Sequence, residues 1–480
     1  MRLDELTATI SCQLTGEAGT EIAGLQYDSR KVQAGDLFFC ISGFKKDGHE
    51  YAESAVKQGA AALMVARQLD LDIPQIIVED DRLAMAEIAC RFYGDPAKKL
   101  MMIGVTGTNG KTTITYMLKS ALEKAGKKVG LIGTIHNMIG DQEIHTEHTT
   151  PEAPDLNALL ARMVGEGCNA LVIEVSSHSL ALKRVAGITF DVGIFTNLTQ
   201  DHLDFHTDFD DYAAAKAKLF AASRQCVLNA DDAAYKTMQA AAKGCVKLYG
   251  INNKADYSAD DIVVTPEGIS FNYYRETQLV KRLNMHVTGY FNAYNALAAL
   301  GTLDVLGLPE SAGIETLETM HAVDGRCQVL PTGGRGFSVI LDYAHTPDSL
   351  QSTISSVRRF AKGRIITVFG CGGDRDAKKR PIMGEISGRL SDFSVITSDN
   401  PRTEDPFKIL EQVEAGMKQT SGEYTVIENR REAMKYAMQM AKQDDIVILA
   451  GKGHETYQEI NGVKYDFDEK VVVKELLSEI

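Results

Sequence analysis

The segment TGTNGKTT, Thr106 to Thr113, constrains the fold of this chain more than any other feature. It follows an apolar run, MMIGV, and precedes ITYMLKSALEKAG, whose apolar spacing is helical and which ends at Gly126. The backbone amides of such a turn can wrap phosphate oxygens, while Lys111 neutralises them and Thr112 binds Mg²⁺. The segment therefore predicts a nucleotide phosphate site at the first turn of a helix.

The phosphate loop departs from the strict GxxxxGK[ST] pattern. Val105 stands at the first glycine position, and Gly104 lies one residue earlier. A plain strand-to-helix turn with a surface lysine is the alternative, and the strand and helix patterns on either side argue against it. The loop residues expected to bind ATP are Gly107, Thr108, Asn109, Gly110, Lys111, Thr112 and Thr113.

Apolar runs around the loop predict an α/β fold. ALVIEVS (170–176) and VGIFTN (192–197) are almost continuously apolar, as parallel strands covered on both faces are. We therefore expect a central doubly wound P-loop ATPase domain. Before it, DLFFCIS, AALMV and QIIV, with the helical stretch EYAESAVKQGA, indicate a small α/β unit. After it, SVILDYAHT, RIITVFGCGG, FSVITSDN and DIVILAGKG alternate with helical segments and indicate a Rossmann-like α/β domain.

A chain of 480 residues exceeds the size at which one hydrophobic core usually stops growing, so we expect three domains. The stretch QVLPTGGRG (328–336) clusters Pro and Gly and indicates a boundary. The expected divisions are an N-terminal domain at 1–98, a central domain at 99–332 and a C-terminal domain at 333–480.

The net charge of −14 argues against a general affinity for nucleic acid or anionic membrane, because such binding needs a basic surface. Eight cysteines without CxxC spacing are typical of reduced thiols and not of disulfides or a zinc site. The N-terminus lacks a signal-peptide pattern, and no apolar run of about 18 residues occurs. The sequence thus predicts a cytoplasmic protein with no membrane span.

Two polar residues follow the strands next to the loop. Glu174 ends the buried run in ALVIEVSSH, where a carboxylate is costly unless a cation or hydrogen bonds compensate. Ligands of open α/β sheets bind beyond the carboxyl ends of the strands, so Glu174 is expected to bind Mg²⁺, with a structural ion pair as the alternative. His202, in NLTQDHLDFH, lies at the same edge and alone carries little weight.

Polar residues also follow the strands of the last third, and are expected to face a cleft. They are Asp342, Tyr343 and His345; Asp374, Arg375 and Arg380; and Gly451, Lys452, His454 and Glu455. GCGGD does not match GxGxxG, which argues against a dinucleotide site. DNPR, Asp399 to Arg402, combines a turn-forming Asn-Pro with an arginine fork suited to a carboxylate, and an ordinary loop is the alternative.

The helical segment YAAAKAKLF contains Lys216 and Lys218. By residue type alone, both lysines are predicted to be solvated surface side chains.

With these motifs in this order, the chain resembles the Mur ligases, and within them the branch that adds the third residue of the peptidoglycan stem peptide. The resemblance covers essentially the whole chain. It rests on YDSRKVQAGDLF, TGTNGKTT, HTTPEAP, EVSSH, NLTQDHLDFH, YAAAKAKLF, GYFNAYN, DGR, DYAHTPDSL, GCGGDRD, DNPR and AGKGHE. It implies an N-terminal UDP-binding domain, a central ATPase domain and a C-terminal domain that binds the incoming amino acid.

The resemblance also implies residue roles. Ser29 would contact the uridine end of the substrate, and the residues matching muramoyl-peptide and diphosphate contacts are Thr149, Thr150, Ser176 and Arg184. Leu182 stands where the family often has glutamine. The residues matching further ATP contacts are Asn292, Asn295, Arg326 and Asp342. Lys216 matches a lysine carbamylated by CO₂, which reverses the prediction of a solvated side chain.

The implied catalytic residues are Lys111, Glu174, His202 and Lys216, and the implied ligands of two Mg²⁺ ions are Thr112, Glu174, His202 and carbamylated Lys216. DNPR is the form that the family associates with meso-diaminopimelate. The implied contacts for that amino acid are Arg375, Asp399, Asn400, Pro401, Arg402, Gly451 and Glu455. The implied reaction joins meso-diaminopimelate to the D-glutamate γ-carboxyl of UDP-N-acetylmuramoyl-L-alanyl-D-glutamate through an acyl phosphate, and we expect a monomer.

Three alternative functions stay open at this point. One is the same reaction with L-lysine. A second is a folylpolyglutamate synthetase-like ligase, which lacks the UDP domain suggested by YDSRKVQAGDLF. The third is a P-loop switch or transport ATPase, which hydrolyses ATP and forms no new bond.

Overall fold

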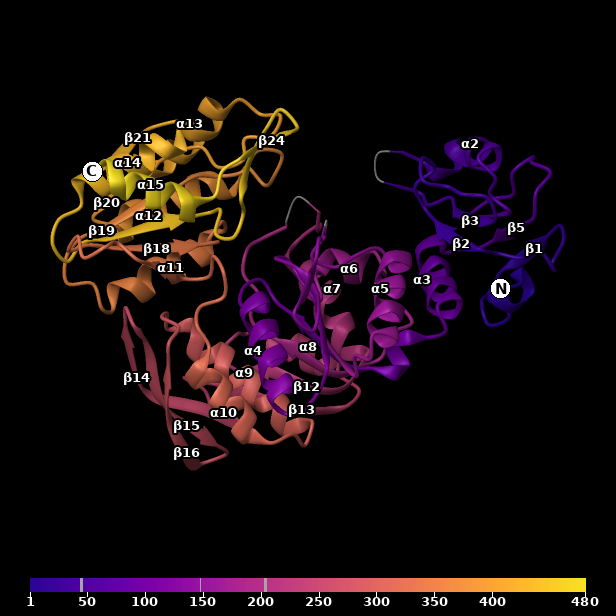
Figure 1. The fold of residues 1–480 in the computed structure, drawn as a ribbon, viewed down its shortest axis with the longest axis horizontal. Helices are drawn as coiled ribbons and strands as arrows, with labels where there is room; N and C mark the ends of the chain where they lie inside the picture. Colours follow the sequence, from indigo (N-terminus) through magenta and orange to yellow (C-terminus); the bar gives the residue numbers. More distant parts are fainter. Residues whose placement is uncertain (44–45, 147, 203–204) are drawn as a thin grey trace.

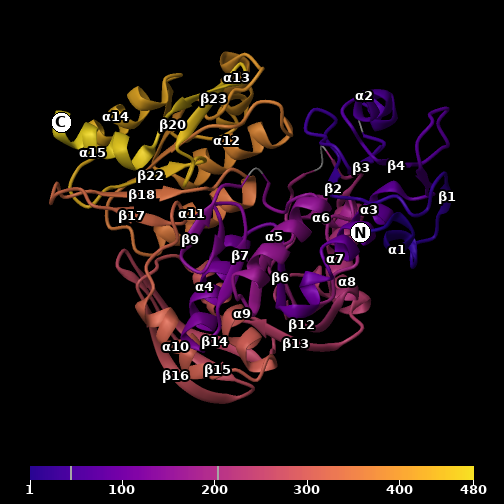
Figure 2. The same ribbon diagram turned by 45° about the vertical axis from the view of Figure 1, so that its right-hand side comes forward.

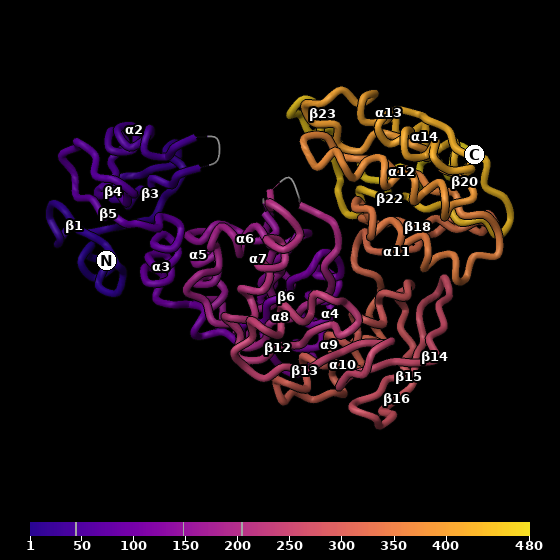
Figure 3. The backbone as a smooth tube through the Cα atoms, turned by 180° about the vertical axis from the view of Figure 1, so that it is seen from behind, coloured from indigo at the N-terminus to yellow at the C-terminus, as the bar shows by residue number. Residues whose placement is uncertain are grey.

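The computed structural model describes residues 1–43, 46–146, 148–202 and 205–480, and it forms three α/β units in chain order (Figure 1). The first unit, in indigo, and the third, in orange and yellow, lie on opposite sides of the central body (Figures 1 and 2). The two termini lie at opposite ends of the molecule (Figure 3). The mixed α/β class predicted from the sequence is confirmed.

The first unit is organised by a five-stranded sheet with the order β1-β5-β4-β3-β2. Strands β2 to β5 are parallel, and β1 pairs antiparallel with β5. The runs DLFFCIS, AALMV and QIIV contain β3, β4 and β5, as predicted. The elements are α1 (Leu3–Thr7), β1 (Gln13–Thr15), β2 (Gly24–Gln26), β3 (Asp36–Phe39), η1 (Gly48–Tyr51), α2 (Ala52–Lys57), β4 (Ala62–Val65), β5 (Gln75–Ile77), α3 (Asp81–Phe92) and η2 (Pro96–Lys99).

The central unit contains an eleven-stranded sheet with the order β16-β15-β14-β13-β12-β11-β6-β10-β7-β8-β9. Its first half comprises β6 (Met101–Thr106), α4 (Lys111–Lys124), β7 (Val129–Ile132), β8 (Asn137–Ile139), β9 (Gln142–Ile144), α5 (Ala153–Gly165), β10 (Ala170–Glu174), α6 (Ser177–Ala181) and β11 (Phe190–Phe195). Its second half comprises α7 (Phe209–Ala221), β12 (Ser223–Asn229), α8 (Tyr235–Ala241), β13 (Cys245–Gly250), β14 (Tyr257–Thr265), β15 (Gly268–Arg275), β16 (Gln278–Met285), α9 (Phe291–Val305) and α10 (Glu310–Thr319).

The position of β6 explains why a ligand site forms here. Strand β6 lies between β10 and β11 and is parallel to both. The chain continues from β6 to β7 on one side and later reaches β11 on the other, which makes the end of β6 a topological switch point. Crevices of this kind are where open α/β sheets bind ligands. The phosphate loop leaves β6 at this crevice.

The sequence reading did not anticipate the antiparallel part of the central sheet. Strands β14, β15 and β16 pair antiparallel and extend the sheet beyond β13. At the opposite edge, β7, β8 and β9 are also antiparallel.

The third unit contains a six-stranded sheet with the order β17-β18-β22-β19-β20-β21, parallel except for β17. A hairpin, β23 and β24, follows it. The elements are β17 (Gln328–Leu330), β18 (Ser338–Asp342), α11 (Pro347–Arg358), β19 (Ile365–Phe369), α12 (Lys379–Leu390), β20 (Phe393–Ile396), α13 (Pro406–Met417), β21 (Tyr424–Val426), α14 (Arg430–Met440), β22 (Ile446–Ala450), β23 (Tyr457–Ile460), β24 (Val463–Asp466) and α15 (Glu469–Glu479).

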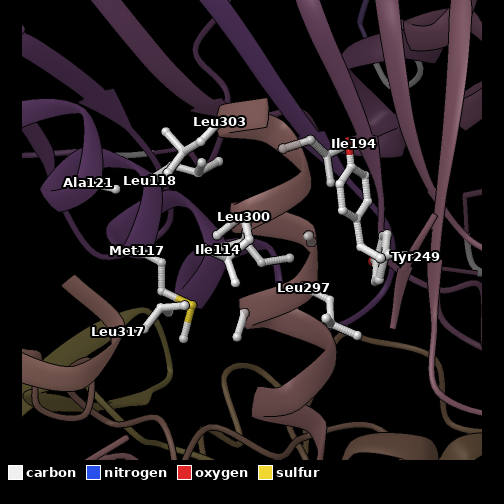
Figure 4. Packing of buried hydrophobic residues seen from close by; sticks show 14 of the residues in the cluster. Ile114, Met117, Leu118, Ala121, Ile194, Tyr249, Leu297, Leu300, Leu303 and Leu317 are labelled. Atoms are coloured by element: carbon white, nitrogen blue, oxygen red, sulfur yellow. The ribbon is translucent and has the colours of Figure 1, made fainter. Parts of the chain in front are cut away.

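The core of the central unit fixes the helix that follows the phosphate loop. Figure 4 shows Ile114 and Leu118 of α4 facing Leu300 and Leu303 of α9, and all four are fully buried. Burying one such side chain contributes roughly 1.5–3 kcal/mol. Because the apolar face of α4 is anchored in this core, its first turn holds the loop in place.

Two further expectations concern the whole chain. All eight cysteines are free thiols. Over the described ranges, none of the helices is long and apolar enough to cross a membrane.

Candidate active site

A cavity of about 600 Å³ opens where the central unit meets the third unit. Eighteen of the residues singled out in the sequence line it. They are Thr108, Asn109, Gly110, Lys111, Thr112, Thr113, Thr149, Thr150, Glu174, Ser176, Arg184, His202, Asn295, Arg326, Asp342, Tyr343, His345 and Arg375. The cavity thus joins the phosphate loop, residues expected to bind the muramoyl peptide, and one arginine expected to bind the amino acid.

The phosphate loop closes tightly around its own lysine. Lys111 Nζ donates hydrogen bonds to the carbonyl oxygens of Gly107 (3.0 Å) and Thr108 (2.9 Å). Gly107 has a φ of +145°, and a Cβ there would lie 1.8 Å from Thr196 Oγ1, so only glycine fits. Burial lowers the pKa of Lys111, and the charge of Glu174 works against that shift.

Two hydrogen bonds connect the loop to residues beyond the central sheet. Asn109 Nδ2 donates to Asp348 Oδ2 of α11 (2.7 Å), and Arg326 Nη2 donates to Thr112 Oγ1 (2.9 Å). Sequence reasoning did not single out Asp348. Its position at the start of a helix, in a segment that follows a strand of the third sheet, was the available signal.

Glu174 ends β10 inside the cavity and is fully buried. Its carboxylate accepts hydrogen bonds from Thr134 N (2.9 Å) and Thr134 Oγ1 (3.0 Å). Among the described residues, no cationic side chain lies within ion-pair distance of this carboxylate. Thr134 therefore compensates part of the burial cost, as hydrogen bonds do for buried carboxylates.

His202 lies in the loop after β11, with its ring 4.7 Å from that of His178 in an edge-to-face arrangement. Its Nε2 is 3.2 Å from Asp201 Oδ2. Burial lowers the pKa of His202 despite the charge of Asp201, so its imidazole is neutral and can offer a lone pair to a metal. Leu203 and Asp204 of the same motif lie outside the described residues.

Lys216 corrects the prediction made from residue type. Its side chain is 1% exposed, and its Nζ donates to the Gly107 carbonyl oxygen (2.9 Å) from beneath the loop. Its Nζ also lies 4.5 Å from the centre of the Tyr212 ring. Burial, aided by the charge of Lys111, lowers the pKa of Lys216 well below its usual value. Lys218, on the opposite face of α7, is exposed as predicted.

The residues expected to contact the nucleoside part of ATP form a connected layer beside the loop. Asn295 Nδ2 donates to Asn292 Oδ1 (2.8 Å), and Asn292 Nδ2 donates to the Thr288 carbonyl oxygen (2.7 Å). Asn292 therefore lies behind Asn295, which lines the cavity. On the facing side, Asp342 accepts from Cys327 N (2.6 Å), and burial raises its pKa.

Part of the cavity lining comes from the segments that follow β9 and β10. Thr150 Oγ1 donates to the Glu174 carbonyl oxygen (2.8 Å), and Arg184 Nη1 donates to the Thr150 carbonyl oxygen (2.9 Å). Arg184 also pairs with Glu152 at 2.7 Å. Ser29 lies apart from this group, in the turn that follows β2, and it does not line the cavity.

The residues expected to bind the amino acid gather at the carboxyl ends of β19, β20 and β22. Asn400 Nδ2 donates to Glu455 Oε2 (2.8 Å), and Lys452 Nζ lies between them, 3.2 Å from Asn400 Oδ1 and 3.3 Å from Glu455 Oε2. Gly451 has a φ of +118°, and a Cβ there would lie 2.5 Å from Asp399 Oδ2. Of the predicted set, Asp399, Asn400, Pro401, Arg402, Gly451 and Glu455 lie outside the cavity lining, and only Arg375 reaches it.

Buried charges support this edge of the third sheet. Burial opposes the charged form of Asp399, but Lys452 and Arg430 outweigh it and lower the pKa of its carboxyl. Burial and the nearby Asp399 raise the pKa of Glu455. Arg380, by contrast, is 1% exposed and pairs with Glu404 at 2.8 Å, so it is a structural residue and does not face the cleft.

Within the residues that the structure describes, no group of three or more His, Cys, Asp or Glu side chains is arranged to hold a metal ion. The predicted ligand set differs from such clusters because it uses a threonine hydroxyl and a modified lysine.

The comparisons with known proteins agree along the whole chain. The description "Mur ligase family, catalytic domain" matches residues 21–93, "Mur ligase middle domain" matches 105–303, and "Mur ligase, glutamate ligase domain" matches 325–453. Together these matches span all three units.

Named relatives are similar over their full length. The UDP-N-acetylmuramoyl-L-alanyl-D-glutamate–2,6-diaminopimelate ligase of Caldanaerobacter subterraneus subsp. tengcongensis is 47% identical over 482 residues, covering 100% of this chain and 99% of that protein. A protein of the same name, numbered 1, from Clostridium acetobutylicum is 46% identical over 486 residues, covering 100% of both. A solved structure of a UDP-N-acetylmuramoyl-L-alanyl-D-glutamate–2,6-diaminopimelate ligase is 32% identical, with a TM-score of 0.72 and coverage of 100% and 99%. This chain belongs to the Mur ligase family.

Proposed function

We propose that this protein is an ATP-dependent ligase that joins meso-diaminopimelate to the D-glutamate γ-carboxyl of UDP-N-acetylmuramoyl-L-alanyl-D-glutamate. The observation that carries the proposal is the single cavity that holds Lys111, Thr150 and Arg375. An ATP phosphate, an acceptor carboxylate and an incoming amino acid must meet in one place for this reaction. The names of the full-length relatives support the same substrates.

The reaction proceeds in two displacements. A γ-carboxylate oxygen attacks the terminal phosphorus of ATP, the bond to the β-phosphate oxygen breaks, and ADP leaves. The amine nitrogen of diaminopimelate then attacks the acyl carbon, the amide bond forms, phosphate leaves, and the amine loses a proton. Lys111 stabilises negative charge on the transferring phosphoryl group, and the backbone amides of the loop hold the phosphates in line.

The chemistry of the surrounding side chains fits Mg²⁺. Thr112 supplies a hydroxyl, Glu174 a buried carboxylate and His202 a neutral imidazole. When bound, Mg²⁺ would neutralise charge on the phosphates as they transfer. Thr112 would have to exchange its hydrogen bond with Arg326 for the metal.

Lys216 is proposed to carry a carbamate. A neutral amine is the form that attacks CO₂, and the lowered pKa of Lys216 favours that form. The nitrogen bonds to the carbon of CO₂, one N–H proton leaves, and the product is a carboxylate beneath the phosphate loop. With that carboxylate, Lys216 would join Glu174 and His202 as a ligand for Mg²⁺.

Selection of the amino acid is assigned to the third sheet. Arg375 and Arg402 can bind the second carboxylate of meso-diaminopimelate, which L-lysine lacks. A pocket that leaves an arginine unpaired rejects the analogue without that carboxylate. The other proposed contacts are Asp399, Asn400, Pro401, Gly451 and Glu455. Ser29, Thr149, Thr150, Ser176 and Arg184 are proposed to hold the UDP-muramoyl dipeptide.

Three domains are proposed to carry these tasks, one for each large sheet. The sequence places the second boundary between residues 332 and 333, but β17 (Gln328–Leu330) pairs with β18 of the third sheet, so we propose the divisions 1–98, 99–327 and 328–480.

An acceptor assay tests the proposal. Phosphate release is measured with ATP, Mg²⁺ and the UDP-muramoyl dipeptide, adding meso-diaminopimelate, L-lysine or L-ornithine at matched concentrations. We expect release that depends on both the dipeptide and meso-diaminopimelate. Equal turnover with L-lysine would contradict the assigned amino acid, and rapid ATP hydrolysis without the dipeptide would contradict a ligase.

A further inference from the structure

Arg402 has a strained backbone that its neighbours enforce. Its φ is +50°, in the left-handed region that a side chain disfavours. Its amide donates to the Glu459 carbonyl oxygen (3.0 Å), and its own carbonyl oxygen accepts from Asn461 N (2.7 Å). Strained conformations persist where the surroundings over-determine them, and they often mark functional sites. Strand β23 and the turn after it therefore impose the conformation of Arg402.

The guanidinium of Arg402 is also held from two sides. Its Nη1 donates to the Gly373 carbonyl oxygen (2.8 Å), and its Nε lies 3.3 Å from a carboxylate oxygen of Glu459. Among the described residues, Nη2 has no hydrogen-bond partner. The two contacts thus fix the plane of the fork and leave one edge available to a ligand.

Gly372 makes room for this arrangement. A Cβ at position 372 would lie 2.9 Å from Arg402 Nη1 and 3.8 Å from Arg375 Cγ. Its backbone is outside the left-handed region, so glycine is not needed for its own conformation. The missing side chain instead leaves room for the Arg402 guanidinium beside the stem of the Arg375 side chain.

We propose that Glu459 and Gly372 are positioning residues that aim the Arg402 fork at the second carboxylate of the incoming amino acid. This inference rests on the proposed function. Glu459 acts through an acceptor oxygen that orients Nε, and Gly372 acts by leaving space beside Nη1. An arginine whose fork is oriented in advance loses less side-chain entropy when it binds a planar carboxylate.

Kinetics of the full chain test the inference, with meso-diaminopimelate varied at saturating ATP and UDP-muramoyl dipeptide. We expect Glu459→Ala and Gly372→Ala each to raise the KM for meso-diaminopimelate by about tenfold, the effect of losing one well-placed charge-assisted hydrogen bond. The kcat and the KM for ATP should stay within about twofold, because the phosphate loop is untouched.

Two more variants separate positioning from a merely structural role. Glu459→Gln keeps an acceptor oxygen, so its KM for meso-diaminopimelate should lie close to the wild-type value. Val463→Ala changes an exposed side chain on the other strand of the same hairpin and should behave as the wild type. Thermal unfolding of each variant shows whether it folds. If Gly372→Ala does not fold, Glu459→Ala alone tests the inference.

The outcomes distinguish the inference from the proposed function. If the wild type releases no phosphate with meso-diaminopimelate, the proposed function is wrong. If the wild type needs meso-diaminopimelate but its KM is unchanged in Glu459→Ala, the inference is overturned and the proposed function stands. A Glu459→Gln variant as impaired as Glu459→Ala would also overturn it.

Discussion

The phosphate loop and the DNPR segment are built in opposite ways. The loop lies at the junction of one strand and one helix, and its lysine bonds to the carbonyl oxygens of Gly107 and Thr108, only three or four positions away. The DNPR segment depends on residues that follow three strands and on the hairpin β23 and β24. A site of the first kind can be found from sequence alone, whereas a site of the second kind requires the topology.

The phosphate loop and the DNPR segment are also proposed to have different tasks in the reaction. Side chains around the loop are proposed to manage charge on the ATP phosphates, which take part in the reaction whatever the amino acid is. Side chains around DNPR are proposed to face the incoming amino acid. Changes near the loop should therefore affect the rate with any amino acid, and changes near DNPR should affect the choice of amino acid.

The largest expected effect is at Lys216. Replacing it with alanine removes the amine that is proposed to carry the carbamate, so kcat should fall by about a thousandfold with any amino acid. Added formate or acetate should restore part of the activity by supplying a carboxylate. Phosphate release is the measurement, and Lys218→Ala, on the exposed face of the same helix, is the matched control. Full activity of Lys216→Ala would end the carbamate hypothesis.

A smaller and different effect is expected at Arg402. In Arg402→Ala, kcat/KM for meso-diaminopimelate should fall by about a hundredfold, since hydrogen bonds between charged groups contribute about 1.5–3 kcal/mol. The kcat at saturating amino acid should change little. Arg389→Ala, which removes an exposed arginine of the same domain, is the control. A loss confined to kcat would contradict the proposed difference between the two sites, because it would show that Arg402 acts in the chemical steps and not in the selection of the amino acid.

The smallest effect concerns stability at the edge of the third sheet. Burial, followed by the charge of Arg326, lowers the pKa of His454 to about 3. The unfolded chain binds this proton near pH 6.5, so the stability from His454 is complete above that pH and is lost as the pH falls toward 3. The loss is at most about 1.4 kcal/mol per pH unit.

Thermal unfolding between pH 7 and pH 5 measures this effect. His454→Asn should show a flatter dependence of the unfolding midpoint on pH than the wild type. A variant of an exposed histidine, His286→Asn, should follow the wild type. Parallel curves for wild type and His454→Asn would show that this side chain does not contribute to acid destabilisation.

Much of the central unit could be predicted from local patterns. The strand before the loop, the helix after it and the placement of Glu174 at a strand end all follow from apolar runs and parallel-sheet geometry. Lys216 was misjudged from its residue type, yet its spacing held a signal. It lies four residues after Tyr212 and four before Phe220, on the apolar face of α7, and both aromatic residues are fully buried.

Other features could not be obtained in this way. The turn at Pro266 to Gly268 and the alternating residues around it are the local signal for β14 and β15. The apolar runs of the central domain predict parallel strands only, and they gave no indication of this antiparallel extension. The contact between Arg402 and Glu459 has no local sequence pattern, because Glu459 lies 57 positions further along the chain and only the fold brings the two residues together.

The hydrogen bond from Arg326 to Thr112 has a thermodynamic consequence. Arg326 belongs to a segment fastened to the third unit, since Asp324 pairs with Lys470 of α15 (2.7 Å) and the Gly325 carbonyl oxygen accepts from Tyr343 N (2.9 Å). Relative to the phosphate loop, the third unit is thus a tethered ligand with a high effective concentration. Any ligand that binds the Thr112 hydroxyl competes with the hydrogen bond from Arg326. By reciprocity, any change that weakens this hydrogen bond strengthens the binding of that ligand. Occupancy of the loop and the freedom of the third unit to move are therefore two measures of one equilibrium.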